Sequence, residues 1–315
     1  MAVSRAVRKC IGIGLLALAL LILMGGLDRL LAPRNLRERL EASRTCRLCD
    51  LGHADLRGAD LVGIDLTGAR LAGADFSTAR LNRANLTLAD IRYAVFHEAK
   101  LKDAVWVNGE ICGADSVGHC LTPDTRRLLT GGQCRGCNLK GATLENAALE
   151  DAQMRGADLN RAALSHARLR GANLARANLT RAVARHADFS GAHLPEADFT
   201  EADLNGSSFT GAYLRSSLMV NVTAQKARLE TADLRSAVLL GANLAGAKLG
   251  GADLSNANLK TAVLTHCDFT GANLARANLT GAAIDGADFT DAYLIDALWT
   301  NGERCEDGSI GRCVQ

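Results

Sequence analysis

The sequence predicts an all-β solenoid of short stacked repeats, divided into two modules. Leucine or a close substitute recurs at every fifth residue from Leu51 to Trp106 and again from Leu139 to Trp299, usually with alanine two positions before it. A fixed short period indicates stacked repeats that contact mainly their neighbours. Five matches neither the helical period of about 3.6 nor the strand period of about 2. Leu139 lies 88 residues after Leu51, which is not a multiple of five, so the two runs are out of phase and form separate modules.

The repeating unit reads A-[D/N]-[L/F]-x-x, as in GADLVGIDLTGARLAGADF and GANLARANLTRAVARHADF. This unit resembles the pentapeptide-repeat family. The resemblance implies a right-handed quadrilateral β-helix, in which four pentapeptides form one square coil of 20 residues. The central Leu or Phe and the Ala before it would point inward, while Asp or Asn and the two following residues would face outward or turn the corner. Coils would stack at the inter-strand spacing of about 4.8 Å.

A square coil predicts side-chain ladders, because residues 20 apart lie on the same face. Three pairs of phenylalanines have this spacing and are expected to stack inside the core: Phe76 and Phe96, Phe189 and Phe209, and Phe269 and Phe289. Two departures from the repeat predict softer places. Ala184 replaces the large inward residue, so we expect a void there, and the irregular units at 217–224 predict a local distortion.

The amino terminus predicts a membrane segment. Residues 10–27 are uncharged and mostly apolar, and as a helix they would be long enough to cross a bilayer. Three basic residues precede this run, and no small-residue cleavage site follows it, so it differs from a cleaved signal peptide. We therefore expect a cytoplasmic segment at 1–9, an uncleaved transmembrane signal anchor at 10–27 and a juxtamembrane segment with a short capping helix at 28–45. The predicted location is a bacterial inner membrane, crossed once, with the repeat body in the periplasm.

The two repeat modules have matching ends. Module 1 is expected at 46–120 and module 2 at 134–315, joined by a linker with a capping helix at 121–133. The modules open with CRLCDL and CRGCNL and close with WVNGEICGADSVGHC and WTNGERCEDGSIGRC. The ends of a solenoid expose apolar core and strand edges, so they need caps. Trp106 and Trp299 are expected to cover the last coils of their modules.

The ten cysteines allow several interpretations. The closing pairs lie outside the repeat and bracket short loops, so we expect local disulfides and an oxidising compartment; these pairs are Cys112 with Cys120 and Cys305 with Cys313. Five others take inward positions, where a small apolar side chain packs well: Cys46, Cys49, Cys134, Cys137 and Cys267. The alternatives are a redox site at the C-x-x-C pairs or a zinc site, the latter formed by Cys112, Cys120, Cys134 and Cys137. We expect no bound metal and no cofactor.

Charge is nearly balanced over the chain but unevenly placed. The chain carries 36 basic and 34 acidic residues. Residues 1–45 contain eight of the basic and three of the acidic residues, so the repeat body has 28 basic and 31 acidic residues. Within module 2 a basic belt precedes an acidic one and includes two histidines 20 residues apart. We expect this belt to dock an anion or a protein, the other interpretation being an ordinary solvated surface. The candidate partner surface comprises Arg161, Arg168, Arg170, Arg176, Arg181, Arg185, His166 and His186.

The sequence favours a binding protein over an enzyme. No nucleophile–base arrangement, phosphate-binding glycine loop or carboxylate pair stands out, and a core filled with Leu and Ala leaves no interior cavity for a substrate. We therefore expect a membrane-anchored scaffold with an unknown protein partner and an unspecified oligomeric state. The resemblance implies one alternative, a DNA mimic that modulates a DNA-associated enzyme such as a topoisomerase, which the near-neutral charge disfavours. Nucleic acid is not an expected ligand.

Overall fold

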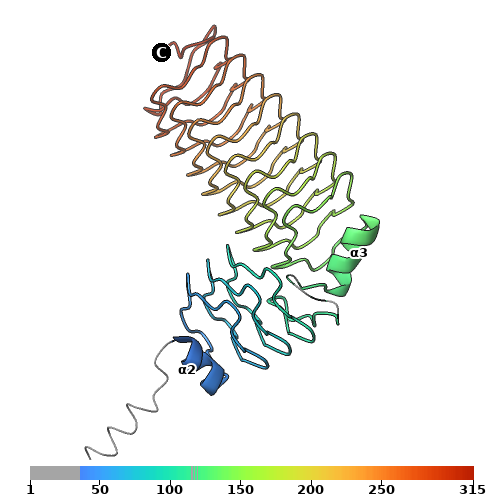
Figure 1. The fold of residues 1–315 in the computed structure, drawn as a ribbon. Coiled ribbons are helices and arrows are strands. Elements are labelled where there is room, and N and C mark those ends of the chain that lie inside the picture. The colour runs from blue at the N-terminus through green and yellow to red at the C-terminus, as the bar shows by residue number, and fades with distance from the viewer. Residues whose placement is uncertain (1–35, 115, 117, 119) are drawn as a thin grey trace, which may run out of the picture.

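The computed structural model describes residues 36–315 with the exception of 115, 117 and 119. Helix α2 (Leu36–Ser43) precedes a first stack of square coils, and helix α3 (Pro123–Gly131) lies between this stack and a second one. Figure 1 shows the two stacks following one another, with α3 at their junction. The β-helical solenoid predicted from the period of five is confirmed.

Each face of a coil is joined to the next coil by parallel backbone pairing. The faces are too short to form extended strands, and each contributes a single bridging residue that pairs with the residue 20 positions later. These bridges run from Thr45↔Asp65 to Asn85↔Val105 in module 1, and from Gln133↔Gln153 to Asn278↔Leu298 in module 2. The 20-residue coil is therefore maintained without interruption along each module.

The corners of the coils use a left-handed backbone. The residue two positions after the inward Leu has a positive φ, as at Arg161, where φ is 58°. Its N–H donates to the next coil, at Thr180 O, over 3.0 Å. A left-handed conformation costs a non-glycine residue about 1–2 kcal/mol, and glycine adopts it freely. The hydrogen bonds between coils hold the other corner residues in this conformation.

The inward residues form one apolar core in each module. The buried cluster of module 1 extends from Leu40 of α2 to Cys120, and that of module 2 from Leu128 of α3 to Cys305. Nearly every inward Leu and Ala is fully shielded from water, and burying one leucine side chain stabilises the fold by about 1.5–3 kcal/mol. The two helices therefore close the starting ends of the two stacks, as predicted from the sequence.

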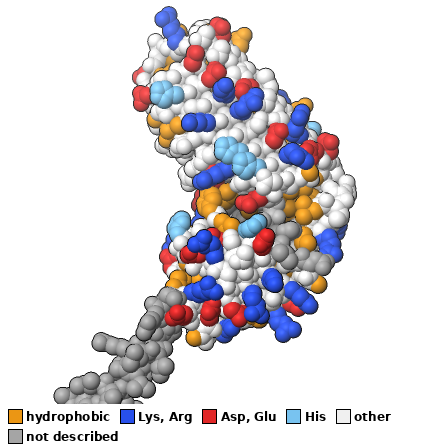
Figure 2. All heavy atoms as spheres, viewed as in Figure 1, with side chains coloured by type: hydrophobic (Ala, Val, Ile, Leu, Met, Phe, Trp, Pro, Cys, Tyr) orange, Lys and Arg blue, Asp and Glu red, His pale blue; other side chains and the backbone are white. Residues whose placement is uncertain are grey.

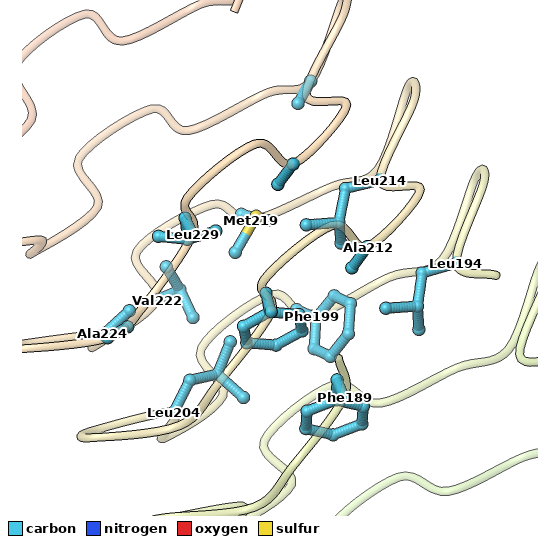
Figure 3. Close-up of a cluster of buried hydrophobic side chains, with 14 of the residues drawn as sticks. Phe189, Leu194, Phe199, Leu204, Ala212, Leu214, Met219, Val222, Ala224 and Leu229 are labelled. Atoms are coloured by element: carbon cyan, nitrogen blue, oxygen red, sulfur yellow. The ribbon is translucent and has the colours of Figure 1, made fainter. Parts of the chain in front are cut away.

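Phenylalanines stack inside the core at the predicted spacing. The ring centroids of Phe189 and Phe209 are 4.7 Å apart, and the pairs 76/96 and 269/289 are separated by 5.1 and 5.0 Å. Phe199 comes from the opposite face and meets Phe189 edge-on at 6.1 Å (Figure 3). Because two large rings meet across the interior beside Ala184, we infer that they use the volume that a leucine there would occupy.

The distortion predicted at 217–224 is wrong. Leu218 and Thr223 keep their bridges to Val238 and Asn243, so the register does not change. Figure 3 shows Met219 and Val222 filling the interior together with Leu204 and Leu229. Inverting the order of small and large residues therefore preserves the packing, because the total side-chain volume is about the same.

Both closing segments turn back over the last coil. Antiparallel bridges pair Val105 with Ile111 and Leu298 with Arg304. Trp106 packs edge-on against Phe96 at 5.4 Å, and Trp299 packs likewise against its neighbouring phenylalanine at 5.3 Å. Disulfides close the two loops, joining Cys112 to Cys120 and Cys305 to Cys313.

The opening cysteines are also paired. Two further disulfides join Cys46 to Cys49 and Cys134 to Cys137, so the interpretation of these residues as unbonded apolar packing is corrected. Inward positions three residues apart bring their Cα atoms to 5.5 and 5.1 Å, within the range a disulfide spans. Cys267 is the buried free thiol among the described residues. The zinc alternative has no free thiolates at its four positions, and no group of potential metal ligands is found in the described chain.

The predicted inner-membrane location must also be corrected. Within 36–315, apart from the three undescribed positions, neither helix has the length and apolar character needed to cross a membrane. Single-pass localisation in an inner membrane therefore has no support in the structure. The predicted segments at 1–9 and 10–27, and residues 28–35 of the predicted juxtamembrane segment, lie outside the described residues.

Candidate binding cleft between the modules

The last coil of module 1 packs against the first coils of module 2. The indole Nε1 of Trp106 donates a hydrogen bond to Gly141 O at 2.7 Å. Beside it, Val107 lies so close that a Cβ atom added to Gly141 would come 2.0 Å from Val107 Cγ2. Trp106 is therefore more than a lid on its own module, because its polar edge is bonded to the next one. Glycine at position 141 permits this approach.

A buried carboxylate forms the second contact between the modules. The hydroxyl of Tyr93 donates to the carboxylate of Asp203, and Arg185 Nε donates to the same carboxylate at 2.7 Å. The guanidinium carbon of Arg185 lies 4.7 Å from the centroid of the Tyr93 ring. Burial, followed by the hydrogen bond and negative charge of Asp203, raises the pKa of Tyr93 to about 12. Because charge-assisted hydrogen bonds are stronger than neutral ones, this triad fastens the two modules together.

Sequence reasoning missed this junction, although the matching ends contain a signal for it. Trp106 and Trp299 are equivalent and 193 residues apart, so each junction residue of module 1 has a counterpart at the closing end of module 2. The junction residues Leu88, Tyr93, Val95 and Val107 correspond there to Gly281, Gly286, Asp288 and Thr300. At these four positions the large side chains therefore belong to the end that contacts another module.

A cleft of about 620 Å³ lies beside these contacts. Module 1 lines it with Ile91 and residues 93–98, and module 2 with residues 143–147, Ala163 and Val183. Gly118, which precedes α3 in the chain, and Leu129 of α3 complete the lining. Figure 2 shows hydrophobic side chains gathered in the hollow between the two modules.

The cleft is apolar because several outward positions depart from the repeat. The residue before the inward one is Asp or Asn in about half of the units, and in the cleft it is Val95, Thr143, Ala163 and Val183. Val95 remains 46% exposed, whereas Val183 is only 4% exposed under the junction. Val95 comes from module 1 and the other three from module 2, and all four line the same cleft, so we take this cleft as the candidate site.

The charged groups of the cleft are acidic. Glu98 and Glu145 line it, together with His97, and the lining contains no lysine or arginine. The His97 ring Nε2 lies 3.8 Å from Glu98 Oε1. Partial burial raises the pKa of Glu145, against the opposing effect of His166. No described residue forms a hydrogen bond or ion pair with the Glu145 carboxylate, so the cleft favours a cationic group.

The basic belt predicted as a partner surface is largely paired within the molecule. Arg176 and Arg181 contact Glu196 and Glu201 of the next coil at 2.9 and 2.7 Å. Further pairs join Arg168 to Glu150 at 2.6 Å, Arg170 to Asp188 at 3.9 Å and Arg185 to Asp203 at 2.7 Å. His166 and His186 stack on the outer edge, with ring centroids 5.2 Å apart. The acidic belt therefore neutralises most of the basic one.

Part of the belt also faces module 1. Arg161 and Arg181 line a second hollow of about 470 Å³ together with Leu88 of module 1. Burial acts to raise the pKa of Asp90, but the hydrogen bond and charge of Arg92, with a contribution from the charge of Arg161, hold it below its ordinary value. These residues therefore belong to the surroundings of the junction as much as to the outer surface.

Comparison with a model of pentapeptide repeats gives matches at residues 49–87, 69–105, 133–171, 157–194, 185–219, 225–260 and 257–296. The chain belongs to the pentapeptide-repeat family. The matches stop at the closing segments and omit the linker. No curated protein matches the chain.

Solved structures of pentapeptide-repeat proteins are similar to this one. HetL from the cyanobacterium Nostoc sp., involved in heterocyst differentiation regulation, is 28% identical over 86% of this chain and 100% of its own, with a TM-score of 0.27. Trypsin-treated QnrB1, a plasmid-mediated fluoroquinolone resistance protein, is 18% identical over 76% of this chain and 89% of its own, with a TM-score of 0.33. A pentapeptide-repeat protein from the thylakoid lumen of Arabidopsis thaliana is 29% identical over 35% of this chain and 63% of its own, with a TM-score of 0.25.

Proposed function

We propose that this pentapeptide-repeat protein is a non-enzymatic scaffold that binds a protein partner in the cleft between its modules. The carrying observation is that Val95 of module 1 and Ala163 and Val183 of module 2 are apolar residues at outward positions that line the same cleft between the modules. Clustered exposed apolar side chains are typical of interaction sites. Membership of a repeat family supports a binding role, because stacked repeats offer rigid extended surfaces.

The basic belt is a weaker candidate for the partner site. Its arginines already contact carboxylates, and such exposed pairs contribute at most about 1 kcal/mol each. Ion pairs between arginines and carboxylates also occur in module 1, for example Arg57 with Asp55 at 2.7 Å. This paired surface gives little reason to prefer the alternative of an acidic DNA mimic.

Val95→Asp tests the cleft directly. It restores the residue type found at the equivalent Asp288, so the coil should still fold. Leu218→Asp is the matched control, because Leu218 holds the same repeat position on an outer face and is 40% exposed. We expect V95D to reduce capture of the native partner at least tenfold in affinity purification, while L218D retains it. Equal capture by V95D and the unaltered protein would remove the cleft as the interaction site.

A further inference from the structure

We propose that the cleft binds an extended peptide segment with a basic side chain, which adds as a strand to the open edge of the last coil of module 1. This inference rests on the proposed function, since it specifies how the partner is held and which chemistry is recognised. The backbone of the last coil, the acidic lining and the comparison between the two closing ends support it.

The closing loop pairs with only one part of the last coil. Leu101 N–H donates to Ser116 O at 3.0 Å, and Asp103 N–H donates to Cys112 O at 3.1 Å. Among the described residues, the N–H groups of Ile91 and Tyr93 have no backbone acceptor. In inner coils the N–H groups at the same repeat positions donate to the next coil, so an edge is left open here.

The same open edge recurs at the end of module 2, where the closing loop is described completely. There Leu294 N–H donates to Ser309 O at 2.9 Å. The N–H groups with no acceptor among the described residues are those of Ile284, Gly286, Phe289 and Asp291. The open edge is therefore a property of how these modules close.

The open edge has the pattern that a parallel strand needs. One coil earlier, Asp90 bridges its neighbour by donating to Ala69 O at 2.9 Å and accepting from Leu71 N–H at 2.8 Å. The equivalent groups at the edge are Ala89 O and Ile91 N–H. The residue that would bridge them, Glu110, instead directs its N–H to Asn108 Oδ1 at 3.0 Å. One residue of an added strand can therefore bond to both groups, and unpaired edges are known templates for such addition.

The environment of the edge differs between the two modules. At module 1 the edge residues Ile91 and Tyr93 line the cleft, where Val95 and Leu129 can cover the apolar side chains of an added strand. Glu98 and Glu145 line the cleft and can pair with a lysine or arginine of that strand. In module 2 the counterparts of Val95 and Glu98 are Asp288 and Asp291, so that edge lacks the apolar side chain that Val95 provides. The binding edge is therefore that of module 1.

The test uses the full chain and two immobilised libraries of nine-residue peptides, one with lysine and one with glutamate fixed at the centre. We expect binding from the lysine library at least tenfold above the glutamate library. Individual lysine peptides should slow amide exchange at Ile91 and Tyr93 at least tenfold. Methylating the bridging backbone nitrogen should weaken binding at least tenfold, since it removes the donor to Ala89 O.

Two variants localise the effect. Glu145→Gln should reduce the preference for lysine at least threefold, while Asp291→Asn, at the open edge of module 2, should leave it unchanged. Equal binding of the two libraries, binding without protection of Ile91 and Tyr93, or binding of neither library would overturn strand addition. If partner capture still depends on Val95 in any of these cases, the proposed function stands and only this mode of binding is lost.

Discussion

The contact between Trp106 and Gly141 gives a sharp test of the junction. Gly141 has a φ of 62°, so Gly141→Ala would place a methyl group 2.0 Å from Val107 Cγ2 and 3.8 Å from the Trp106 indole nitrogen. Gly156→Ala is the matched control, because Gly156 has a φ of 66° and nothing within 4 Å of an added Cβ. Both variants bear the left-handed strain of alanine, about 1–2 kcal/mol. Only G141A adds a clash between the modules.

Overpacking of this kind costs about 1–3 kcal/mol. We expect G141A to shift the equilibrium between docked and separated modules by about 5- to 150-fold more than G156A does. The chain has two tryptophans, so an NMR spectrum of the indole groups reports the junction directly. In G141A the exchange of the Trp106 indole proton should accelerate, while Trp299 serves as the internal reference. Identical stability and identical Trp106 exchange in G141A and G156A would refute docking at Gly141.

Three other predictions concern the junction, the cysteines and the core. Tyr93→Phe should weaken docking by about 1–3 kcal/mol, since it removes a donor from a buried carboxylate. The pKa of Tyr93 is raised from the ordinary tyrosine value of 10 to about 12. The stability gained from its neutral phenol is therefore complete below pH 10 and is lost as the pH rises toward 12. Thermal melts over this pH range should show that loss in the unaltered protein and not in Y93F. Alkylation of unreduced, unfolded protein should modify Cys267 but none of the eight paired cysteines. Detection of alkylated Cys46 or Cys134 by mass spectrometry would contradict the opening disulfides. In the folded protein Cys267 should react slowly, because burial raises the pKa of its thiol to about 11. Ala184→Leu should destabilise module 2 by about 1–3 kcal/mol in denaturant unfolding, and a gain in stability would show that Phe189 and Phe199 leave a void there.

The period of five made the coils predictable, and the reason is physical. Each coil contacts mainly its neighbours, so inward positions, the stacked phenylalanines and the capping helices follow from short-range rules. The opening disulfides were missed because a cysteine that packs inward and one that bonds to its neighbour occupy the same repeat position. Cys46 and Cys49 are an example.

The cleft could not be derived from the period, because it depends on how one module is placed against another. That placement involves α3 and contacts between the modules such as that of Trp106 with Gly141. The relevant signal was in the departures from the repeat. Val95 takes a position where its counterpart Asp288 is acidic, and comparing the two closing ends position by position would have identified it.

The independent ends of the modules have a consequence for how such chains can change in length. From Cys46 to Trp106 there are 60 residues, or three coils of 20, whereas from Cys134 to Trp299 there are 165, or eight coils and one further pentapeptide. The chain therefore leaves module 2 on a face a quarter turn away from the equivalent face of module 1. Inserting five residues before Trp106 would rotate the exit of the linker by this quarter turn and direct module 2 along another axis. Inserting 20 would keep the direction and lengthen module 1 by about 4.8 Å, so direction and length can be altered separately, in steps of one face or one coil.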